Sequence, residues 1–284
     1  MPPAAAKPSF GRVALIGKLR GPEVEVALRE MQLFLLERGC EVLAEGETSA
    51  DLAVVIGGDG SLLAAARDLV RQRVPLVGIN LGRVGFMTDI GQADMRTGIG
   101  AILEGRFTIE ERSLLDAEIR RGDETVLRTI ALNEAVVGKG SEGRLIEFTL
   151  SLDGEFVYTL RADGMIVATP TGSTAYALSA QGPILHPAVP AFALVPLNPH
   201  TLSARPVSVA DRCQIEISLE RALDARAFFD GVAHADMAEG DRLLLKRSAD
   251  VMRFVHPPGY RYFATLREKL RWSEAPLQRG RVAD

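Results

Sequence analysis

The residues best suited to chemistry lie in a short glycine-rich turn, Gly57-Gly58-Asp59-Gly60-Ser61, which joins a predicted strand to a predicted helix. Glycine lets the backbone approach a ligand closely, and the N–H groups at a helix start bind anions, so the turn suits a phosphate group. A carboxylate repels phosphate unless a metal ion intervenes or it accepts a proton from an attacking hydroxyl. Asp59 therefore predicts phosphoryl transfer, although a helix cap explains the turn equally well when it is taken alone.

Two further polar segments stand near the ends of predicted strands. The glycine-rich loop Asn80–Phe86 follows the next strand, so we expect it beside the first turn, at the same edge of the sheet. Asn133 and Glu134 are successive residues in an apolar stretch. Because adjacent strand residues point to opposite faces, both can bind one ligand only at a turn or strand end. Taken alone, the loop fits a structural connection and the pair fits an exposed surface.

The segment 163–176 is the most informative part of the chain. It begins with Asp163 and ends in a Pro-Gly loop with more hydrogen-bonding capacity than a simple connection uses. Such a loop suits a polyhydroxylated ligand, in which Asp163 could accept from ribose hydroxyls or a carboxamide and Tyr176 could offer its ring to adenine. The hydroxyl groups belong to Thr169, Thr171, Ser173, Thr174 and Tyr176.

The elements that must position these residues begin as an alternation of strands and helices. This alternation predicts a mainly parallel sheet, in which ligands gather at the carboxyl ends of the strands. Apolar runs predict the strands, and apolar residues at helical spacing predict the helices. The expected order is strand Arg12–Gly17, helix Glu23–Arg38, strand 51–56, helix Ser61–Arg71 and strand Val74–Ile79.

After about residue 107 the pattern changes to short strands, with an expected hairpin over 146–160 that turns at Asp153-Gly154. Further strands are expected at 213–219, 225–229 and 241–247. The helix pattern at Tyr262–Trp272 suggests that the chain returns to the first domain. The pattern therefore predicts an α/β domain of residues 10–107 with 262–284, and a mostly β domain of residues 108–261.

Composition excludes several classes of protein. The 284 residues are 47% hydrophobic and 25% charged, which is ordinary for a packed soluble enzyme. Because 33 Lys and Arg face 37 Asp and Glu, no overall positive field exists to collect nucleic acid or an anionic membrane. Cys40 and Cys213 are far apart and form no disulfide or zinc pattern. No secretory signal or membrane-spanning run is recognisable, so we expect a cytoplasmic protein.

These segments together resemble the ATP-dependent NAD kinases. The resemblance covers about residues 12–272, and the blocks occur in the family's order. Gly-Gly-Asp-Gly alone is shared with lipid kinases and phosphofructokinases, whereas the whole set is specific. The blocks are Gly57–Gly60, Asn80–Phe86, Asn133-Glu134, Asp163-Gly164, Thr169–Tyr176 and Pro199–Pro206.

The resemblance implies the fold class α/β plus all-β, with an N-terminal Rossmann-like α/β domain, a C-terminal β-sandwich domain and a site between them. In this site ATP would phosphorylate the adenosine 2′-hydroxyl of NAD. Asp59 would be the general base, and Gly57, Gly58, Gly60 and Ser61 would face the donor phosphates. It also implies a homodimer or homotetramer. The implied NAD-binding residues are Gly60, Phe86, Asn133, Glu134, Arg144, Arg161, Asp163, Thr171, Thr174, Ala175, Tyr176, Ala177, Leu178, Ser179 and Asn198.

A divalent metal, most simply Mg²⁺, is expected on the donor phosphates, since developing charge must be neutralised and the chain shows no Walker lysine. Many relatives carry Gln shortly after a late Asp-Gly pair, whereas Val232 follows Asp230-Gly231 here. The alternatives are a lipid or sugar kinase, and an NAD-binding regulator without catalysis. A dehydrogenase is disfavoured because its glycine fingerprint is missing. Donor range, NAD against NADH, oligomeric state and feedback by the product stay open.

Overall fold

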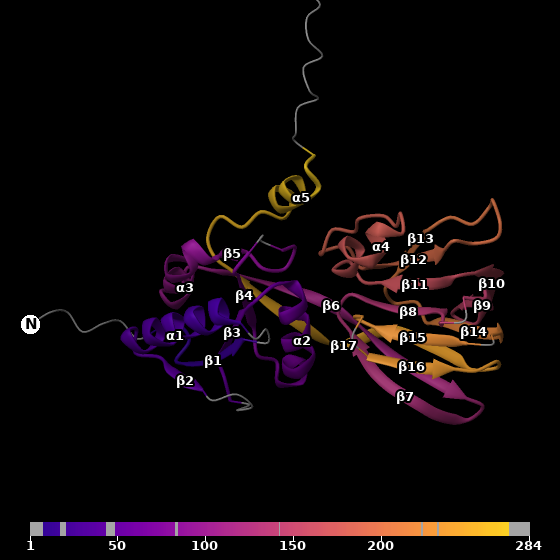
Figure 1. Cartoon of the computed structure of the whole chain (residues 1–284), viewed down its shortest axis with the longest axis horizontal. Coiled ribbons are helices and arrows are strands. Elements are labelled where there is room, and N and C mark those ends of the chain that lie inside the picture. Colours follow the sequence, from indigo (N-terminus) through magenta and orange to yellow (C-terminus); the bar gives the residue numbers. More distant parts are fainter. Residues whose placement is uncertain are drawn as a thin grey trace, which may run out of the picture. The chain divides into compact units, whose positions relative to one another are not determined.

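Two compact units divide the chain, and each is built from discontinuous segments (Figure 1). The computed structural model describes residues 8–17, 21–43, 49–82, 85–141, 143–222, 224–231 and 233–272. The first unit takes in the chain up to Ala65, Val74–Glu110 and the segment from Phe254 onward, and the second takes in Ala66–Arg73 and Glu111–Arg253. Val232 lies outside the described residues, as do Arg83 and Val84 in the predicted Asn80–Phe86 loop.

The first unit is an α/β layer. Its strands follow the order β2-β1-β3-β4, all parallel, and β5 pairs with β4. The helices α1, α2 and α3 lie alongside these strands, in indigo and purple in Figure 1. The elements are β1 (Arg12–Gly17), α1 (Pro22–Glu37), β2 (Glu41–Leu43), β3 (Leu52–Ile56), α2 (Asp59–Leu69), η1 (Val70–Gln72), β4 (Leu76–Asn80), β5 (Ile90–Gly91), η2 (Gln92–Asp94) and α3 (Met95–Leu103).

Packing explains why the strands of the first unit are continuous apolar runs. All five residues of β3 and all five of β4 are buried, as expected for a parallel sheet covered on both faces. Helix α1 places Ala27, Met31 and Leu35 on one face, and these residues join the core around Ile56 and Ile79. Since β3 and β4 are neighbours, the loops that follow them start at the same edge of the sheet.

The second unit is built almost entirely of strands. One antiparallel sheet contains β10-β9-β14-β17, with β6 and β7 continuing from β17, and the other follows the order β13-β12-β11-β8-β15-β16. The elements are β6 (Thr108–Arg121), β7 (Glu124–Ala131), β8 (Glu134–Lys139), β9 (Ile146–Leu152), β10 (Glu155–Ala162), β11 (Gly164–Ala168), η3 (Gly172–Thr174), α4 (Tyr176–Ser179), β12 (Ala191–Leu197), β13 (Val207–Ala210), β14 (Ile215–Arg221), β15 (Ala225–Phe229), β16 (Ala233–Met237) and β17 (Arg242–His256).

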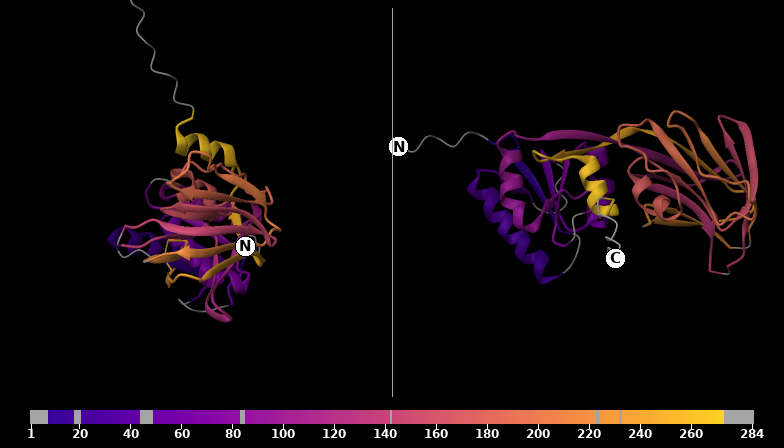
Figure 2. Two further views of the ribbon diagram at one scale, coloured as in Figure 1. Left: turned by 90° about the vertical axis from the view of Figure 1, so that its right-hand side faces the viewer. Right: turned by 90° about the horizontal axis from the view of Figure 1, so that it is seen from above.

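The two sheets of the second unit share one apolar core and form the two layers seen in Figure 2. Phe148 and Leu243 come from the first sheet, Phe192 and Phe229 come from the second, and all four side chains are fully buried. The alternating burial along β9, β14 and β15 is the pattern that places one strand face on a core. These layers are the β-sandwich predicted from the sequence.

The structure confirms the predicted fold class and several elements, including the strands Arg12–Gly17 and 225–229 and the hairpin over 146–160. Asp153 and Gly154 adopt φ of 51° and 82°, which a tight hairpin turn requires. The strand expected at 241–247 is longer, because β17 runs on to His256 and Phe254 pairs with Leu76 of the first unit. Helix α5 (Tyr262–Leu270) follows it.

Helix α3 was not expected from the sequence. Its residues Met-Arg-Thr-Gly-Ile-Gly-Ala-Ile-Leu include two glycines, which weaken helical propensity. Burial of Met95, Ile99 and Ile102 in the apolar core of the first unit compensates for this weak propensity. Within the described ranges, no helix combines the length and apolar character needed to cross a lipid bilayer.

Candidate active site

Asp59 is the first residue of α2, and its carboxylate is held by the loop that follows β4. Oxygen Oδ2 accepts a hydrogen bond from the backbone N–H of Phe86 at 2.8 Å, and Oδ1 accepts one from Met87 at 3.1 Å. The Thr88 hydroxyl lies 3.3 Å from Oδ1. The two glycine loops predicted to lie together are therefore in direct contact, and backbone donors orient the Asp59 carboxylate as an acceptor.

Thr88 organises this loop. Its hydroxyl accepts from the Asn80 side-chain amide at 3.0 Å and from the Gly85 N–H at 2.8 Å, which leaves its proton for Asp59. Asn80 in turn accepts from the Gly82 N–H at 2.7 Å. Only glycine fits at position 85, because a Cβ there would lie 1.9 Å from Asp59 Oδ1. The loop residues thus act together on one carboxylate.

The glycine turn before Asp59 is anchored at one end and open beside the helix start. The N–H of Gly57 donates to the Ile79 carbonyl at 2.8 Å, which ties the end of β3 to β4. A Cβ at Gly58 or Gly60 would meet nothing within 4 Å. The turn therefore leaves space next to the first N–H groups of α2, where an anion is favoured.

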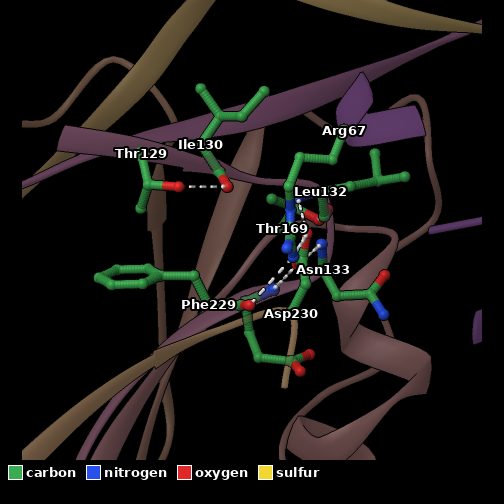
Figure 3. A network of polar contacts seen from close by, with 9 residues as sticks. Arg67, Thr129, Ile130, Leu132, Asn133, Thr169, Phe229 and Asp230 are labelled. Atoms are coloured by element: carbon green, nitrogen blue, oxygen red, sulfur yellow. Dashed lines mark hydrogen bonds and ion pairs between the residues drawn. The ribbon is translucent and has the colours of Figure 1, made fainter. Parts of the chain in front are cut away.

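In the second unit, Asn133 and Glu134 form a corner at the start of β8, which is the strand-end position that lets both face one ligand. The carboxylate of Asp230 holds this corner by accepting from the N–H groups of Leu132 at 2.9 Å, Asn133 at 2.7 Å and Glu134 at 3.3 Å. Figure 3 shows Asp230 beside Leu132, Asn133 and Arg67. Arg67 Nη2 lies 3.7 Å from Asp230 Oδ2 and donates to the Phe229 carbonyl at 3.2 Å.

Three polar atoms at this corner are buried without a partner: Asn133 Oδ1, Glu134 Oε2 and Arg67 Nε. Buried polar atoms are normally hydrogen-bonded, and exceptions of this kind occur where a ligand completes the set. Burial, together with the nearby charge of Asp230, raises the pKa of Glu134 to about 7. Burial also raises the pKa of Asp230, against the lowering effect of its three backbone bonds.

Glu134 lines a hollow of about 430 Å³, a volume that suits part of a small-molecule ligand. A second hollow of about 590 Å³ adjoins it, since Tyr176, Leu197 and Asn198 line both. The first is also lined by Val136, Gly138, Lys139, Asp163, Phe228 and Gly231. The second is also lined by Ser179, Ala180, Gln181, Pro196, Pro199, Ala204, Arg205 and Pro206.

Asp163 lies at the wall of the first hollow with a fixed orientation. Lys139 Nζ contacts its Oδ1 at 2.6 Å, and the Asn198 side-chain amide donates to its Oδ2 at 2.9 Å. These two bonds, first that from Lys139, lower the pKa of Asp163. Asp163 is thus an ionised acceptor near the predicted residue Asn198. Lys139 was not singled out from the sequence, because a single lysine ending an apolar strand carries no signal.

The hydroxyl-rich loop uses much of its hydrogen-bonding capacity on backbone carbonyl groups of the protein. Thr169 and Ser173 are completely buried, and their hydroxyls donate to the carbonyls of Leu132 and Pro170. Thr174 donates to the Thr171 carbonyl at 3.1 Å. The loop packs so closely on the Asn133 corner that a Cβ at position 172 would lie 2.0 Å from the Asn133 carbonyl. Its first role in the structure is to support that corner.

The predicted site residues divide into groups by where the structure places them. Asp59 and Phe86 meet in the first unit; Glu134, Asp163, Tyr176, Ser179 and Asn198 line the hollows of the second. Tyr176 is 48% exposed and available to a ligand, whereas Ala177 is fully buried. Thr171 is buried, and its hydroxyl accepts a hydrogen bond from the Arg112 side chain at 3.3 Å. No sequence pattern indicated Arg112 at the site.

Arg144 and Arg161 line neither hollow. Arg144 is exposed after β8, and Arg161 on β10 is 68% exposed, with its nearest carboxylate at Glu147, 3.9 Å away. The sequence did not indicate that Asp230 and Arg67 support the corner at Asn133 and Glu134. A signal for Asp230 existed, since its Asp-Gly pair follows a buried strand, but its partners lie almost a hundred residues away.

Metal binding by protein groups alone finds no support here. Across the described residues, no three His, Cys, Asp or Glu side chains gather closely enough to hold a metal ion between them. Mg²⁺ commonly keeps several water ligands and binds one or two carboxylates together with substrate phosphates. The described residues are thus compatible with a metal that arrives with phosphates, and they contain no group of three side chains that would hold the ion alone.

Comparisons with known proteins converge on one family. The ATP-NAD kinase N-terminal domain matches residues 40–107, and the ATP-NAD kinase C-terminal domain matches residues 132–257. The chain is 54% identical to the NAD kinase of Aromatoleum aromaticum over 288 residues, covering 94% of this chain and 96% of that one. It is 51% identical to the NAD kinase of an Azoarcus species over 287 residues, covering 94% and 98%.

Solved structures agree in fold. An NAD kinase from Archaeoglobus fulgidus in complex with ATP has a TM-score of 0.76 and 28% identity, covering 92% of this chain and 98% of that one. Yeast NADH kinase in complex with NADH has a TM-score of 0.84, covering 98% and 90%, and at 22% identity it supports the fold alone.

Proposed function

The chain belongs to the ATP-NAD kinase family, a family of phosphotransferases, and we propose that it transfers the γ-phosphate of ATP to the adenosine 2′-hydroxyl of NAD. The products are NADP and ADP. The structural observation that carries the proposal is the Asp59 carboxylate, which backbone donors orient beside an open, glycine-lined helix start.

In the proposed reaction Asp59 is the general base. It accepts the proton of the 2′-hydroxyl as that oxygen bonds to the γ-phosphorus, and the bond from this phosphorus to the β–γ bridging oxygen breaks. The N–H groups of Phe86 and Met87 keep the carboxylate in one orientation before the substrate arrives. Gly57, Gly58, Gly60 and Ser61 are proposed to face the donor phosphates, supported by the open space beside this turn.

The dinucleotide is proposed to bind at the corner and hollows of the second unit. Asn133 and Glu134 would take the ribose and phosphate part, because their buried oxygens, Asn133 Oδ1 and Glu134 Oε2, lack partners. Asp163, held as an ionised acceptor, would take the nicotinamide carboxamide. Tyr176, Ser179 and the other residues from Thr171 to Ser179 would surround adenosine. Arg144 and Arg161 are the weakest members of the proposed set, since they line neither hollow.

A divalent metal ion, proposed as Mg²⁺, would be held chiefly by the phosphates of the donor, because the described residues contain no cluster of three ligating groups. When bound, such an ion neutralises the charge that develops on the transferring phosphate. The ATP complex of the Archaeoglobus relative supports ATP as the donor.

The proposal is tested by incubating the purified chain with each donor and acceptor in turn and measuring NADP or NADPH. The donors are ATP, other nucleoside triphosphates and polyphosphate, and the acceptors are NAD and NADH. We expect NADP from NAD and ATP only when a divalent ion is added. Diacylglycerol and fructose 6-phosphate serve as acceptors for the rival kinase assignments.

Two results would overturn the proposal. Phosphorylation of diacylglycerol or of the sugar in place of NAD would assign the chain to a different kinase reaction. Tight NAD binding with no NADP under any donor or metal would identify a binding protein without catalysis. The proposed homodimer or homotetramer is checked in the same preparation by light scattering with and without NAD.

A further inference from the structure

A buried histidine in the first unit lies between two carboxylates. His256, the last residue of β17, is 2% exposed. Its Nδ1 contacts Asp89 Oδ2, and its Nε2 lies 3.0 Å from Glu110 Oε2 on β6. The ring of Tyr260 stacks on the imidazole with centroids 3.8 Å apart and planes 6° from parallel. None of these residues belongs to the proposed substrate or base set.

The contacts of His256 favour its charged form. A neutral imidazole has one N–H and can donate to one carboxylate, whereas the imidazolium donates to both. Burial opposes the charge, but the bonds and charges of Asp89 and Glu110 outweigh burial, so the pKa of His256 is raised. The groups that face the imidazole from the packed elements are Asp89, Glu110 and the Tyr260 ring.

Asp89 directly follows the residues that hold Asp59. Phe86, Met87 and Thr88 supply every hydrogen bond described for the Asp59 carboxylate. Thr88 is tied on one side to Asn80 at the end of β4, and its next neighbour, Asp89, is tied to His256. The segment that orients the base is therefore fastened at its C-terminal end by two contacts, one from β4 and one from β17.

We propose that His256 is a positioning residue. It holds Asp89 and thereby keeps the segment Phe86–Thr88 in the position that orients the Asp59 carboxylate. This inference rests on the proposed role of Asp59 as base. Misplacement of a catalytic group by about 1 Å can cost about a hundredfold in rate, so a loosened segment is expected to lower turnover without touching the NAD-binding corner.

Two amide substitutions separate the two contacts of the ring. In His256→Asn the side-chain amide nitrogen comes near the position of Nδ1 and can donate to Asp89. In His256→Gln it comes near the position of Nε2 and can donate to Glu110. We expect His256→Asn to keep turnover within about threefold of the wild type, and His256→Gln to lose about ten- to a hundredfold in kcat with the KM for NAD unchanged.

Hydrogen exchange gives a readout that does not require activity. The amides of Phe86 and Met87, which donate to Asp59, should exchange faster in His256→Gln than in His256→Asn. The matched control is Asp211→Asn, which removes the buried partner of Arg247 in the second unit. It should lower the Tm without changing kcat or the exchange of these two amides.

The pH profile adds a third measurement. Because the pKa of His256 is raised, the double contact is complete at low pH and is lost as the pH rises through the pKa of the folded state. The neutral ring keeps one N–H, and on Nδ1 this N–H still donates to Asp89, so the kcat of the wild type and that of His256→Asn should change alike across this pH range.

The outcomes separate this inference from the proposed function. Equal losses of kcat in both amide variants, in proportion to their Tm and with unchanged amide exchange, would reduce His256 to a structural residue and overturn the inference. A wild-type chain that forms no NADP would overturn the proposed function, while the exchange experiment would still decide whether His256 positions the segment.

Discussion

Asp230 and Glu134 are two buried acids joined by two hydrogen bonds, one to the Asp230 carboxylate and one between backbone groups. The N–H of Glu134 donates to the Asp230 carboxylate at 3.3 Å, and the N–H of Asp230 donates to the Glu134 carbonyl at 3.0 Å. This reciprocal contact joins β8 to the end of β15 and places two like charges close together. As a result, Asp230 builds the corner that carries Glu134 and also disfavours ionisation of its carboxyl group.

Replacing Asp230 by Asn is expected to loosen the corner. The amide supplies one acceptor oxygen in place of two, and a buried N–H left without a partner costs about 1–3 kcal/mol. We expect a comparable fall in the free energy of unfolding, measured in denaturant, and roughly tenfold weaker NAD binding, measured by calorimetry. Asp241→Asn is the matched control, because Asp241 is fully buried and bonds Arg121 and Ala238. An Asp230→Asn protein that binds NAD like the wild type would contradict this role.

The raised pKa of Glu134 predicts a pH-dependent stability. The folded state holds this proton up to a pH of about 7, whereas the unfolded chain releases it near 4.5. Stability from this group is therefore lost as the pH rises from 4.5 to 7, by roughly 3 kcal/mol in all. Glu134→Gln should match the wild type in stability at low pH and exceed it above pH 7, as measured by denaturant unfolding at each pH.

Glu118→Gln is the control for that experiment, with the opposite sign. Hydrogen bonds from Arg120, Thr125 and Arg128 lower the pKa of Glu118 to about 2, so its stabilisation is present above the unfolded pKa and is lost on acidification. At neutral pH Glu118→Gln should be less stable than the wild type. A Glu134→Gln protein that loses stability at pH 8 would show that the carboxylate is instead stabilised in the folded state.

Substitution of Gly85 by Ala is expected to displace the base. The added Cβ would lie 1.9 Å from Asp59 Oδ1 and 2.3 Å from its Cγ, so either the loop or the carboxylate must move. We expect a loss of about a hundredfold in kcat for NADP formation. Gly91→Ala is the matched control, since a Cβ at Gly91 meets nothing within 4 Å. Equal turnover in the two variants would argue against an oriented Asp59.

Asp59→Asn tests the base itself. General-base assistance typically contributes ~10²–10⁴ in rate, so turnover should fall by that factor while NAD binding is retained. The Asn side chain can accept from only one of the two N–H groups of Phe86 and Met87, so we also expect about 1 kcal/mol lower stability. Asp94→Asn, at an exposed aspartate, controls for the change of charge. Near-normal turnover of Asp59→Asn would contradict the assignment of Asp59 as the general base.

Local sequence determined much of the fold of this protein. The apolar runs 12–17 and 51–56 identified two strands of the parallel sheet, of which the second is fully buried. Asp153-Gly154 identified a hairpin, because turn geometry depends on neighbouring residues. The contact between the two glycine loops also followed from sequence, since the ends of adjacent parallel strands share an edge.

Only the tertiary structure decided which polar groups support others and which remain available to a ligand. Thr169, Ser173 and Tyr176 all contribute hydroxyl groups to the hydroxyl-rich loop. The structure bonds the hydroxyls of Thr169 and Ser173 to backbone carbonyls, whereas Tyr176 lines both hollows. The backbone donors to the Asp230 carboxylate lie 96–98 residues away along the chain, and the two carboxylates that contact His256 lie 146–167 residues away. A hydrogen bond requires two atoms within about 3 Å, and for such pairs that distance is set by how the strands assemble rather than by any local pattern.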